Sequence, residues 1–194
     1  MRQDVVIRPE RAEEFNQIDQ MVCDSFTKGT NYSNGVDVVD FIHEIRDSKY
    51  YIPALSFVAT VDGDMAGHFM FSYFPLSASE KPGEYDKTVI ETPIVMLAPV
   101  AVAPPFFRQG VGTAMITQGL GIVRDRGFRG AQVEGSPAFY HRFGFRTSSE
   151  LGFSCVMKGQ WLLDHPECMM MMEMHPGAMK GMHGYIDYSM YKNA

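Results

Sequence analysis

The feature that most constrains this chain is an apolar run over 92–104 that leads into a glycine-containing turn and then a periodic stretch over about 110–126. Proline cannot donate to a strand ladder, so Pro99 inside the run predicts a bulge or a local splay near Ala98-Pro99. After the turn, apolar residues recur at helical spacing: Ile116, Leu120 and Val123. A buried strand, a tight turn and an amphipathic helix are therefore expected in that order.

The turn PPFFRQGVGTAM over 104–115 has the composition of an anion-binding helix start. The first N–H groups of a helix lack internal partners and carry a partial positive charge, and glycines let a ligand approach that backbone closely. These properties suit a pyrophosphate, although Gly-x-Gly before a helix is as often only a tight turn. The segment is not a Walker A loop, because no Gly-Lys-Ser/Thr follows, and it lacks the third glycine of a Rossmann fingerprint.

The other elements predict an α/β fold, a mixed sheet with helices on its faces. Asp62-Gly63 between two β-rich runs predicts a hairpin. The four methionines over 169–172 predict a buried strand and not a metal site, and the polar stretch 75–88 predicts a long exposed loop that could cover a substrate site. Strands are expected at 4–8, 55–61, 65–74, 130–135, 153–157, 168–174 and 184–190, and further helices at 15–26, 38–45 and 137–143.

The length and charge favour one globular domain that binds a small anion. A chain of 194 residues is typical of one domain, here 1–194 with a cofactor core at about 92–146 and C-terminal strands at 150–190. The net charge of −6 argues against a nucleic-acid partner. Six arginines against two acids make the stretch 108–146 locally +4, which suits a small anionic ligand. Solvated arginines near helix ends would explain about half of them equally well.

Three cysteines, Cys23, Cys155 and Cys168, are odd in number and widely spaced, so we expect neither a disulfide framework nor a zinc site. The six histidines show no metal-binding spacing. The N-terminus has no apolar signal-peptide region, and no apolar run approaches the roughly 18 residues of a membrane span. We therefore expect a cytoplasmic protein with no metal and no membrane partner.

Three segments resemble motifs of the GNAT N-acetyltransferase superfamily. VMLAPVAVAPPFFRQGVGTAMITQGL resembles its cofactor motif, a strand, then Gln/Arg-x-x-Gly-x-Gly/Ala, then a helix. SPAFYHRFGF (136–145) resembles its Tyr-x-x-x-Gly-Phe element, and VIRPERAEEF resembles its usual start. The likeness spans most of 4–145, and the tail MEMHPGAMKGMHGYIDY resembles a branch of predicted GNAT acetyltransferases with an extended C-terminal hairpin. The resemblance implies a GNAT-like acyl-CoA N-acyltransferase fold and transfer of an acetyl group from acetyl-CoA to an amine.

Carried over position by position, the resemblance implies a cofactor site along this segment. Backbone groups of Val100 and Val102 would bond the pantetheine arm of acetyl-CoA, which the splay near Pro99 would admit. Arg108 would add a positive side chain beside the pyrophosphate. The N–H groups facing the pyrophosphate would be those of Gln109, Gly110, Val111, Gly112 and Thr113. Tyr140 stands where the family has the tyrosine that protonates the departing thiolate as a general acid, although alone it would equally be a buried aromatic.

The sequence departs from the family pattern in two places. Phe107 stands where the motif's first Gln or Arg belongs, so the polar contact of that position is lost. The stretch 135–137 is shorter than the family's usual approach to the late helix. The reaction also needs a base that removes a proton from the amine. Glu134 is the first candidate, followed by His68 and Glu91, although the residue types alone favour a structural or surface-exposed role for each.

The acceptor is expected to be a primary amine of a small molecule or a protein, and the segments expected to bind it, 26–50 and 75–90, carry no readable signature. Two other functions stay open. Phe107 motivates a non-catalytic acyl-CoA-binding or regulatory module on the same fold. The methionine-rich C-terminal third motivates an acyltransferase that uses longer acyl groups. The oligomeric state is also open, and a homodimer is one option.

Overall fold

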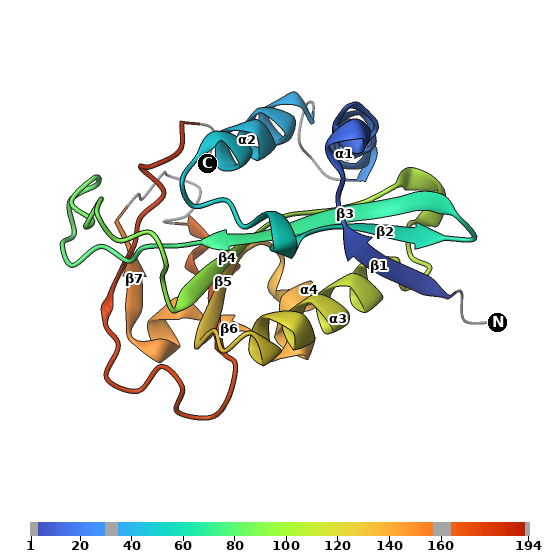
Figure 1. Cartoon of the computed structure of the whole chain (residues 1–194). Helices are drawn as coiled ribbons and strands as arrows, with labels where there is room; N and C mark the ends of the chain where they lie inside the picture. The colour runs from blue at the N-terminus through green and yellow to red at the C-terminus, as the bar shows by residue number, and fades with distance from the viewer. Residues whose placement is uncertain (1–3, 30–34, 157–163, 193–194) are drawn as a thin grey trace. The chain divides into compact units, whose positions relative to one another are not determined.

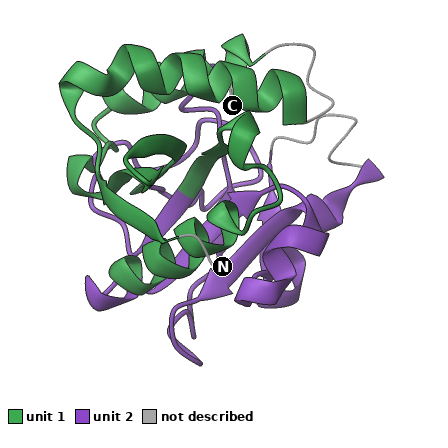
Figure 2. Cartoon of the chain, turned by 90° about the vertical axis from the view of Figure 1, so that its right-hand side faces the viewer, with its two compact units in different colours: residues 1–72, 97–123, 193 green, residues 73–96, 124–192, 194 purple. Residues whose placement is uncertain are grey.

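The computed structural model describes residues 4–29, 35–156 and 164–192, and the chain divides into two compact units (Figure 2). Unit 1 contains the residues up to Ser72 together with 97–123, and unit 2 contains 73–96 and 124–192. The expectation of one domain over 1–194 stays a prediction.

The strands form a seven-stranded mixed sheet in the order β1-β2-β3-β4-β5-β8-β6, and β7 pairs with β9 in a second sheet (Figure 1). The strands are β1 Val5–Pro9, β2 Ser56–Val61, β3 Asp64–Tyr73, β4 Ile94–Val102, β5 Gly130–Glu134, β6 Arg146–Thr147, β7 Phe153–Cys155, β8 Met169–Glu173 and β9 Gly184–Ile186. The helices are α1 Phe15–Gly29, α2 Val36–Asp47, α3 Val111–Asp125 and α4 Pro137–Tyr140. The expected mixed α/β fold is confirmed. Within the described ranges, no helix combines the length and hydropathy needed to cross a bilayer.

Unit 1 is built on the antiparallel strands β1, β2 and β3, with α1 and α2 on one face and α3 on the other (Figure 1). Helix α3 approaches β3 closely through two glycines. A Cβ at Gly119 would lie 2.5 Å from a ring atom of Phe69, and a Cβ at Gly67 would lie 2.6 Å from the sulfur of Met115. The close contact holds the start of α3 against the sheet.

The hairpin between β2 and β3 turns at Asp62-Gly63, as expected. Both residues are left-handed, with φ of 52° and 91°, which matches the twist that a two-residue hairpin loop requires. The helical stripes are confirmed at their centres, where Ile18, Val22 and Ile42 are buried. Phe15 and Phe26, at the ends of the stripe on α1, are only half-buried.

Strand β4 passes from unit 2 into unit 1. It runs parallel to β5 only from Ile94 to Met96, where Met96 lies opposite Gln132. The Ala98-Pro99 peptide, which is cis, follows two residues later. The end of this pairing agrees with the splay expected near Pro99.

In unit 2 the four methionines form β8, which pairs antiparallel with β5 and is buried along Met169–Met172. The sequence missed β6, which has two residues. The C-terminal hairpin expected from the resemblance is not formed by β8 and β9, because β9 pairs in parallel with β7.

The C-terminal segment and the loop expected over 75–88 hold each other in place. The Ser77 N–H donates to the Tyr185 carbonyl at 2.8 Å, and the Tyr185 N–H donates to the Ser77 carbonyl at 2.6 Å. The buried Asp187 carboxylate accepts the N–H groups of Gly83 and Ser189, each at 2.9 Å. The strand predicted at 184–190 therefore ends at Ile186, since Asp187 bonds to a loop and not to a strand.

Candidate active site

The turn before α3 has two left-handed residues that redirect the chain into the helix. A short 3-10 helix, Pro104–Phe106, follows β4. Arg108 then takes φ 60° and Gly110 takes φ 88°. Helix α3 begins at the next residue, Val111.

The first N–H groups of α3 are free to bind a ligand. The Ala114 N–H donates to the Gly110 carbonyl at 3.0 Å and is the first to be bonded in the helix. The N–H groups of Val111, Gly112 and Thr113 find no acceptor among the residues that the structure describes. Gln109, the first of the five expected residues, points its N–H at the Phe106 carbonyl over a long 3.4 Å. We call the segment 108–113 the N–H cradle.

Of the side chains around the cradle, Phe107 and Gln109 contact other parts of the protein, and Arg108 is exposed. A Cβ at Gly29 would lie 2.8 Å from the Phe107 ring, so this phenylalanine packs against the end of α1 where the family has a polar residue. The Gln109 amide donates to the Pro105 carbonyl at 2.6 Å. Arg108 is exposed and makes no hydrogen bond or ion pair within the described part of the chain. Its guanidinium is therefore available to an anion.

Val100 and Val102, expected to bond a pantetheine arm, lie half-buried on β4. The Val102 N–H already donates to the Ser25 hydroxyl oxygen at 3.2 Å. Ser25 is buried on α1, 77 residues away in the sequence, and its role could not be predicted. A ligand strand that uses the Val102 N–H would have to displace Ser25.

The resemblance implies that the cradle binds acetyl-CoA, so replacing Gly110 with alanine is expected to weaken that binding about tenfold. The added Cβ would meet no atom within 4 Å, so the effect comes from the left-handed φ, which costs an alanine about 1–2 kcal/mol and shifts the turn. Gly127 at the other end of α3 is a matched control, because it has φ 84° and equally open space. Gly127→Ala should lose similar stability in urea unfolding and keep its affinity in calorimetry. Equal acetyl-CoA affinities in both variants would show that the N–H cradle does not bind this ligand.

Tyr140 lies in unit 2, where aromatic rings and a glycine enclose it. Its ring packs edge-on against Phe139 at 5.0 Å and Phe145 at 5.7 Å. A Cβ at Gly135 would lie 2.7 Å from the Tyr140 ring, so the shortened stretch 135–137 accommodates the tyrosine. The side chain is 8% exposed, and its hydroxyl bonds to no described residue. Burial raises the pKa of this phenol, which therefore keeps its proton across the physiological range.

Glu134 ends β5 in the same unit and has the environment of a base. Its side chain is exposed at the strand end, yet desolvation by the surrounding protein raises the pKa of the carboxyl. It forms no ion pair with a described residue. A carboxylate without a cationic partner and with a raised pKa can accept a proton from an amine.

The other two candidate bases lie elsewhere. His68 is fully buried in unit 1, with its Nε2 2.9 Å from the Glu10 carboxylate. Burial lowers the pKa of His68 despite Glu10, so the neutral ring donates from Nε2. Glu91 is exposed in the segment before β4. His68 therefore serves the core of unit 1 and is closed to a substrate.

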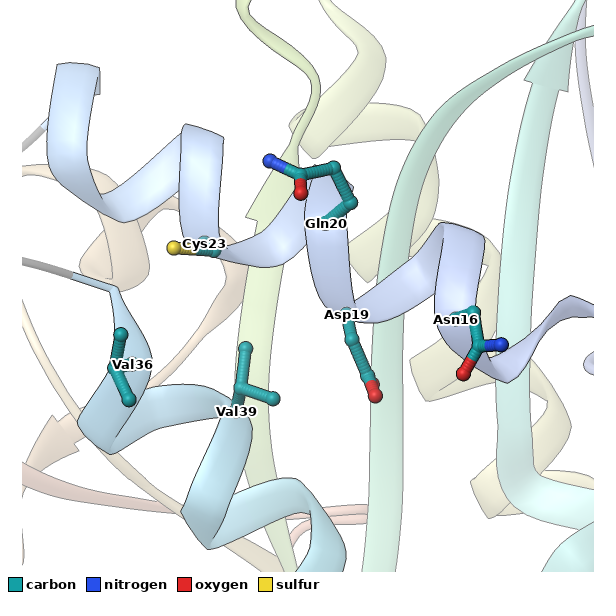
Figure 3. A pocket seen from close by; sticks show the side chains of 6 residues that line it. All are labelled: Asn16, Asp19, Gln20, Cys23, Val36 and Val39. Atoms are coloured by element: carbon teal, nitrogen blue, oxygen red, sulfur yellow. The ribbon is translucent and has the colours of Figure 1, made fainter.

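A shallow pocket of about 260 Å³ lies between α1 and α2 (Figure 3). Its one carboxylate, Asp19, is already paired with His43 at 2.7 Å and with Arg46 at 3.3 Å. The lining residues are Asn16, Asp19, Gln20, Cys23, Val36 and Val39. The Asp19 carboxylate is therefore already paired and is not free to bind a cationic amine. No group of three or more His, Cys, Asp or Glu side chains suited to a metal occurs within 4–29, 35–156 and 164–192.

Comparison with known proteins identifies the class to which this fold and these residues belong. The model of the acetyltransferase (GNAT) family matches residues 17–145. The chain therefore belongs to the GNAT acetyltransferase family.

Two N-acetyltransferases of Escherichia coli strain K12 are similar to this chain. The uncharacterized N-acetyltransferase YjhQ is 32% identical over 119 residues, which are 61% of this chain and 59% of YjhQ. The uncharacterized N-acetyltransferase YhbS is 24% identical over 153 residues, 78% of this chain and 81% of YhbS. The alignment with YjhQ thus spans less than two thirds of that relative.

Two solved structures share the fold. The crystal structure of E. coli YhbS in complex with CoA has a TM-score of 0.75 at 22% identity, over 98% of this chain and 92% of that one. A GNAT acetyltransferase from Brucella melitensis in complex with acetyl-CoA has a TM-score of 0.68 at 23% identity, over 98% of both chains. At these identities the likeness speaks for the fold alone.

Proposed function

We propose that this protein transfers an acetyl group from acetyl-CoA to a primary amine of a small molecule or a protein. The observation that carries the proposal is the run of free N–H groups at Val111, Gly112 and Thr113. A diphosphate is the ligand for which such a helix start is suited. The YhbS and Brucella structures were solved with CoA and acetyl-CoA, which supports the same ligand class.

In unit 1, the N–H cradle and Arg108 are proposed to hold the pyrophosphate, and the backbone of Val100 and Val102 is proposed to hold the pantetheine arm. Acetyl-CoA supplies an acyl group activated as a thioester. The amine nitrogen bonds to the carbonyl carbon and the carbon–sulfur bond breaks. Glu134 receives the proton that the amine loses, and Tyr140 donates the proton that the departing thiolate takes up.

An excess of acetyl-CoA is expected to raise the melting temperature by about 5–10 °C, because a ligand at 100 times its Kd adds about 2.7 kcal/mol. The measurement is differential scanning fluorimetry, with NADH and ATP as controls and octanoyl-CoA as a longer acyl donor. A shift with acetyl-CoA but not with NADH or ATP would justify screening amines for thiol release. An unchanged melting temperature with acetyl-CoA would contradict the proposal. A larger increase with octanoyl-CoA would favour an acyltransferase that uses longer acyl groups.

We propose a cytoplasmic location and one domain over 1–194, as the sequence predicts. A homodimer is one assembly that sedimentation would detect. Polar side chains on β5 bear on how the amine is recognised.

A further inference from the structure

A buried carboxamide on β5 lacks one hydrogen-bond partner. Gln132 is fully buried in unit 2, and its Nε2 donates to the Tyr188 hydroxyl and to the Met169 sulfur, the latter at 3.1 Å. The Tyr188 hydroxyl also donates to that sulfur, at 3.6 Å. The Gln132 Oε1 atom bonds to no described residue. Buried polar groups are nearly always paired, so an orphan oxygen indicates a missing ligand or water.

Exchanging the oxygen and nitrogen of the carboxamide does not remove the deficit. With the oxygen toward Tyr188, the hydroxyl would donate to it, and the Gln132 NH₂ would become the unpaired group. The Met169 sulfur is only a weak acceptor. One polar atom of the amide therefore needs an outside partner in either orientation, and the present orientation leaves an acceptor free.

Two further acceptors belong to the same unit, the Glu134 carboxylate on β5 and the Tyr188 hydroxyl that bonds to Gln132. Glu134 is two residues from Gln132, and side chains at i and i+2 share one face of a strand. Burial raises the pKa of Tyr188, and the charge of Glu134 raises it further. The Tyr188 ring is held by Phe74, at 5.3 Å between centroids. Gln132 therefore bonds to the Tyr188 phenol and shares a strand face with the Glu134 carboxylate.

We infer that Gln132, Glu134 and Tyr188 form the recognition site for the acceptor, whose amine nitrogen is held by the free Gln132 oxygen. The inference rests on the proposed function and adds to it the residues that select the amine. All three groups accept hydrogen bonds, and an ammonium or amine offers two or three N–H donors. A carboxylate or phosphate ligand would have no donor to offer them.

The amine reaches the Gln132 oxygen only when a neighbouring side chain moves, since Gln132 is fully buried. Met169 touches the carboxamide and is unbranched with three rotatable bonds, so it can change rotamer at small cost. Tyr188 lies beyond the end of β9, in the segment that Asp187 ties to the loop. Gln132 orients the nitrogen while Glu134, two residues along the strand, takes its proton.

The test compares Gln132→Met with the wild type on ethanolamine, benzylamine, lysine and spermidine, following thiol release. The variant should raise the KM for the accepted amine about 10–100-fold, because a hydrogen bond to a charged group is lost. The KM for acetyl-CoA should stay the same. The melting temperature should hold or rise, because methionine removes an unpaired buried oxygen. Gln118→Met, on the exposed face of α3, is the control and should change neither KM.

The outcomes separate this inference from the proposed function. An unchanged amine KM in Gln132→Met would overturn it and mark the oxygen as a buried-water site. Failure of all four amines in a wild type that acetyl-CoA stabilises would also overturn it, and acyl-CoA binding would stand. A wild type that acetyl-CoA does not stabilise would defeat the proposed function instead. If Gln132→Met does not fold, Tyr188→Phe keeps the ring on Phe74 and must raise the amine KM for the inference to hold.

Discussion

Tyr140→Phe is expected to lower kcat about 10²–10⁴-fold with little change in the KM for acetyl-CoA. The substitution removes the oxygen proposed to protonate the departing thiolate and leaves the ring among Phe139 and Phe145. The hydroxyl bonds to no described residue, so its loss should not lower the melting temperature. Stopped-flow and steady-state thiol release on an amine that the wild type accepts would measure the effect.

Tyr185→Phe is the matched control, because it removes the same atom from a tyrosine of the same unit. The Tyr185 hydroxyl donates to Glu80 at 3.1 Å on the exposed side of the loop. This variant should keep the wild-type kcat. If Tyr140→Phe also kept it, the proton would come from another group, and the role proposed for Tyr140 would be withdrawn.

The parts of the fold that the sequence predicted are those set by local rules. Left-handed φ values at Asp62 and Gly63 make the hairpin. The stripe on α3 follows from helical periodicity, and each expected member is buried. The N–H cradle follows from a glycine at the start of a helix. Strand β6 was missed because two residues carry no periodic pattern.

The contacts that the sequence could not predict join residues far apart in the chain. Ser25 and Val102 are 77 residues apart, Gln132 and Tyr188 are 56 apart, and Glu10 and His68 are 58 apart. A single sequence gives no sign that two such residues meet. His68 is the instructive case, since its residue type suggested a base and only its burial beside Glu10 assigns it to the core of unit 1. The sequence likewise could not predict that the Gln132 oxygen is buried without a partner.

Arg46→Met is expected to lower the free energy of unfolding by about 3–5 kcal/mol. Arg46 on α2 is 7% exposed and binds the 2% exposed Glu10 carboxylate at 2.7 and 3.2 Å. Its guanidinium also lies 3.9 Å over the Phe15 ring. Methionine keeps the apolar stem and leaves the Glu10 charge buried with fewer donors. Urea unfolding followed by circular dichroism would measure the change in midpoint and slope.

A surface pair in the same unit provides the control. Arg8 binds Glu14 at 2.5 Å, but the two side chains are 30% and 17% exposed. Arg8→Met should therefore lose less than about 1 kcal/mol. Equal losses in the two variants would show that burial of the Glu10 charge is not what makes Arg46 necessary. The double variant Glu10→Gln/Arg46→Met should recover part of the stability, because the buried charge at position 10 is then removed.

The pH dependence of stability is a second test of whether the buried Glu10 charge causes the loss in Arg46→Met. Burial alone would raise the pKa of Glu10, but hydrogen bonds from His68, Arg46 and Tyr51 hold it well below its usual range. A depressed carboxyl pKa contributes stability that is present above the unfolded value of about 4.3 and is lost as the pH falls below it. Arg46→Met should therefore differ most from the wild type near pH 7, and the difference should shrink as Glu10 becomes protonated in the variant. A difference that stays constant down to pH 3 would assign the loss to packing on Phe15 and not to the buried charge.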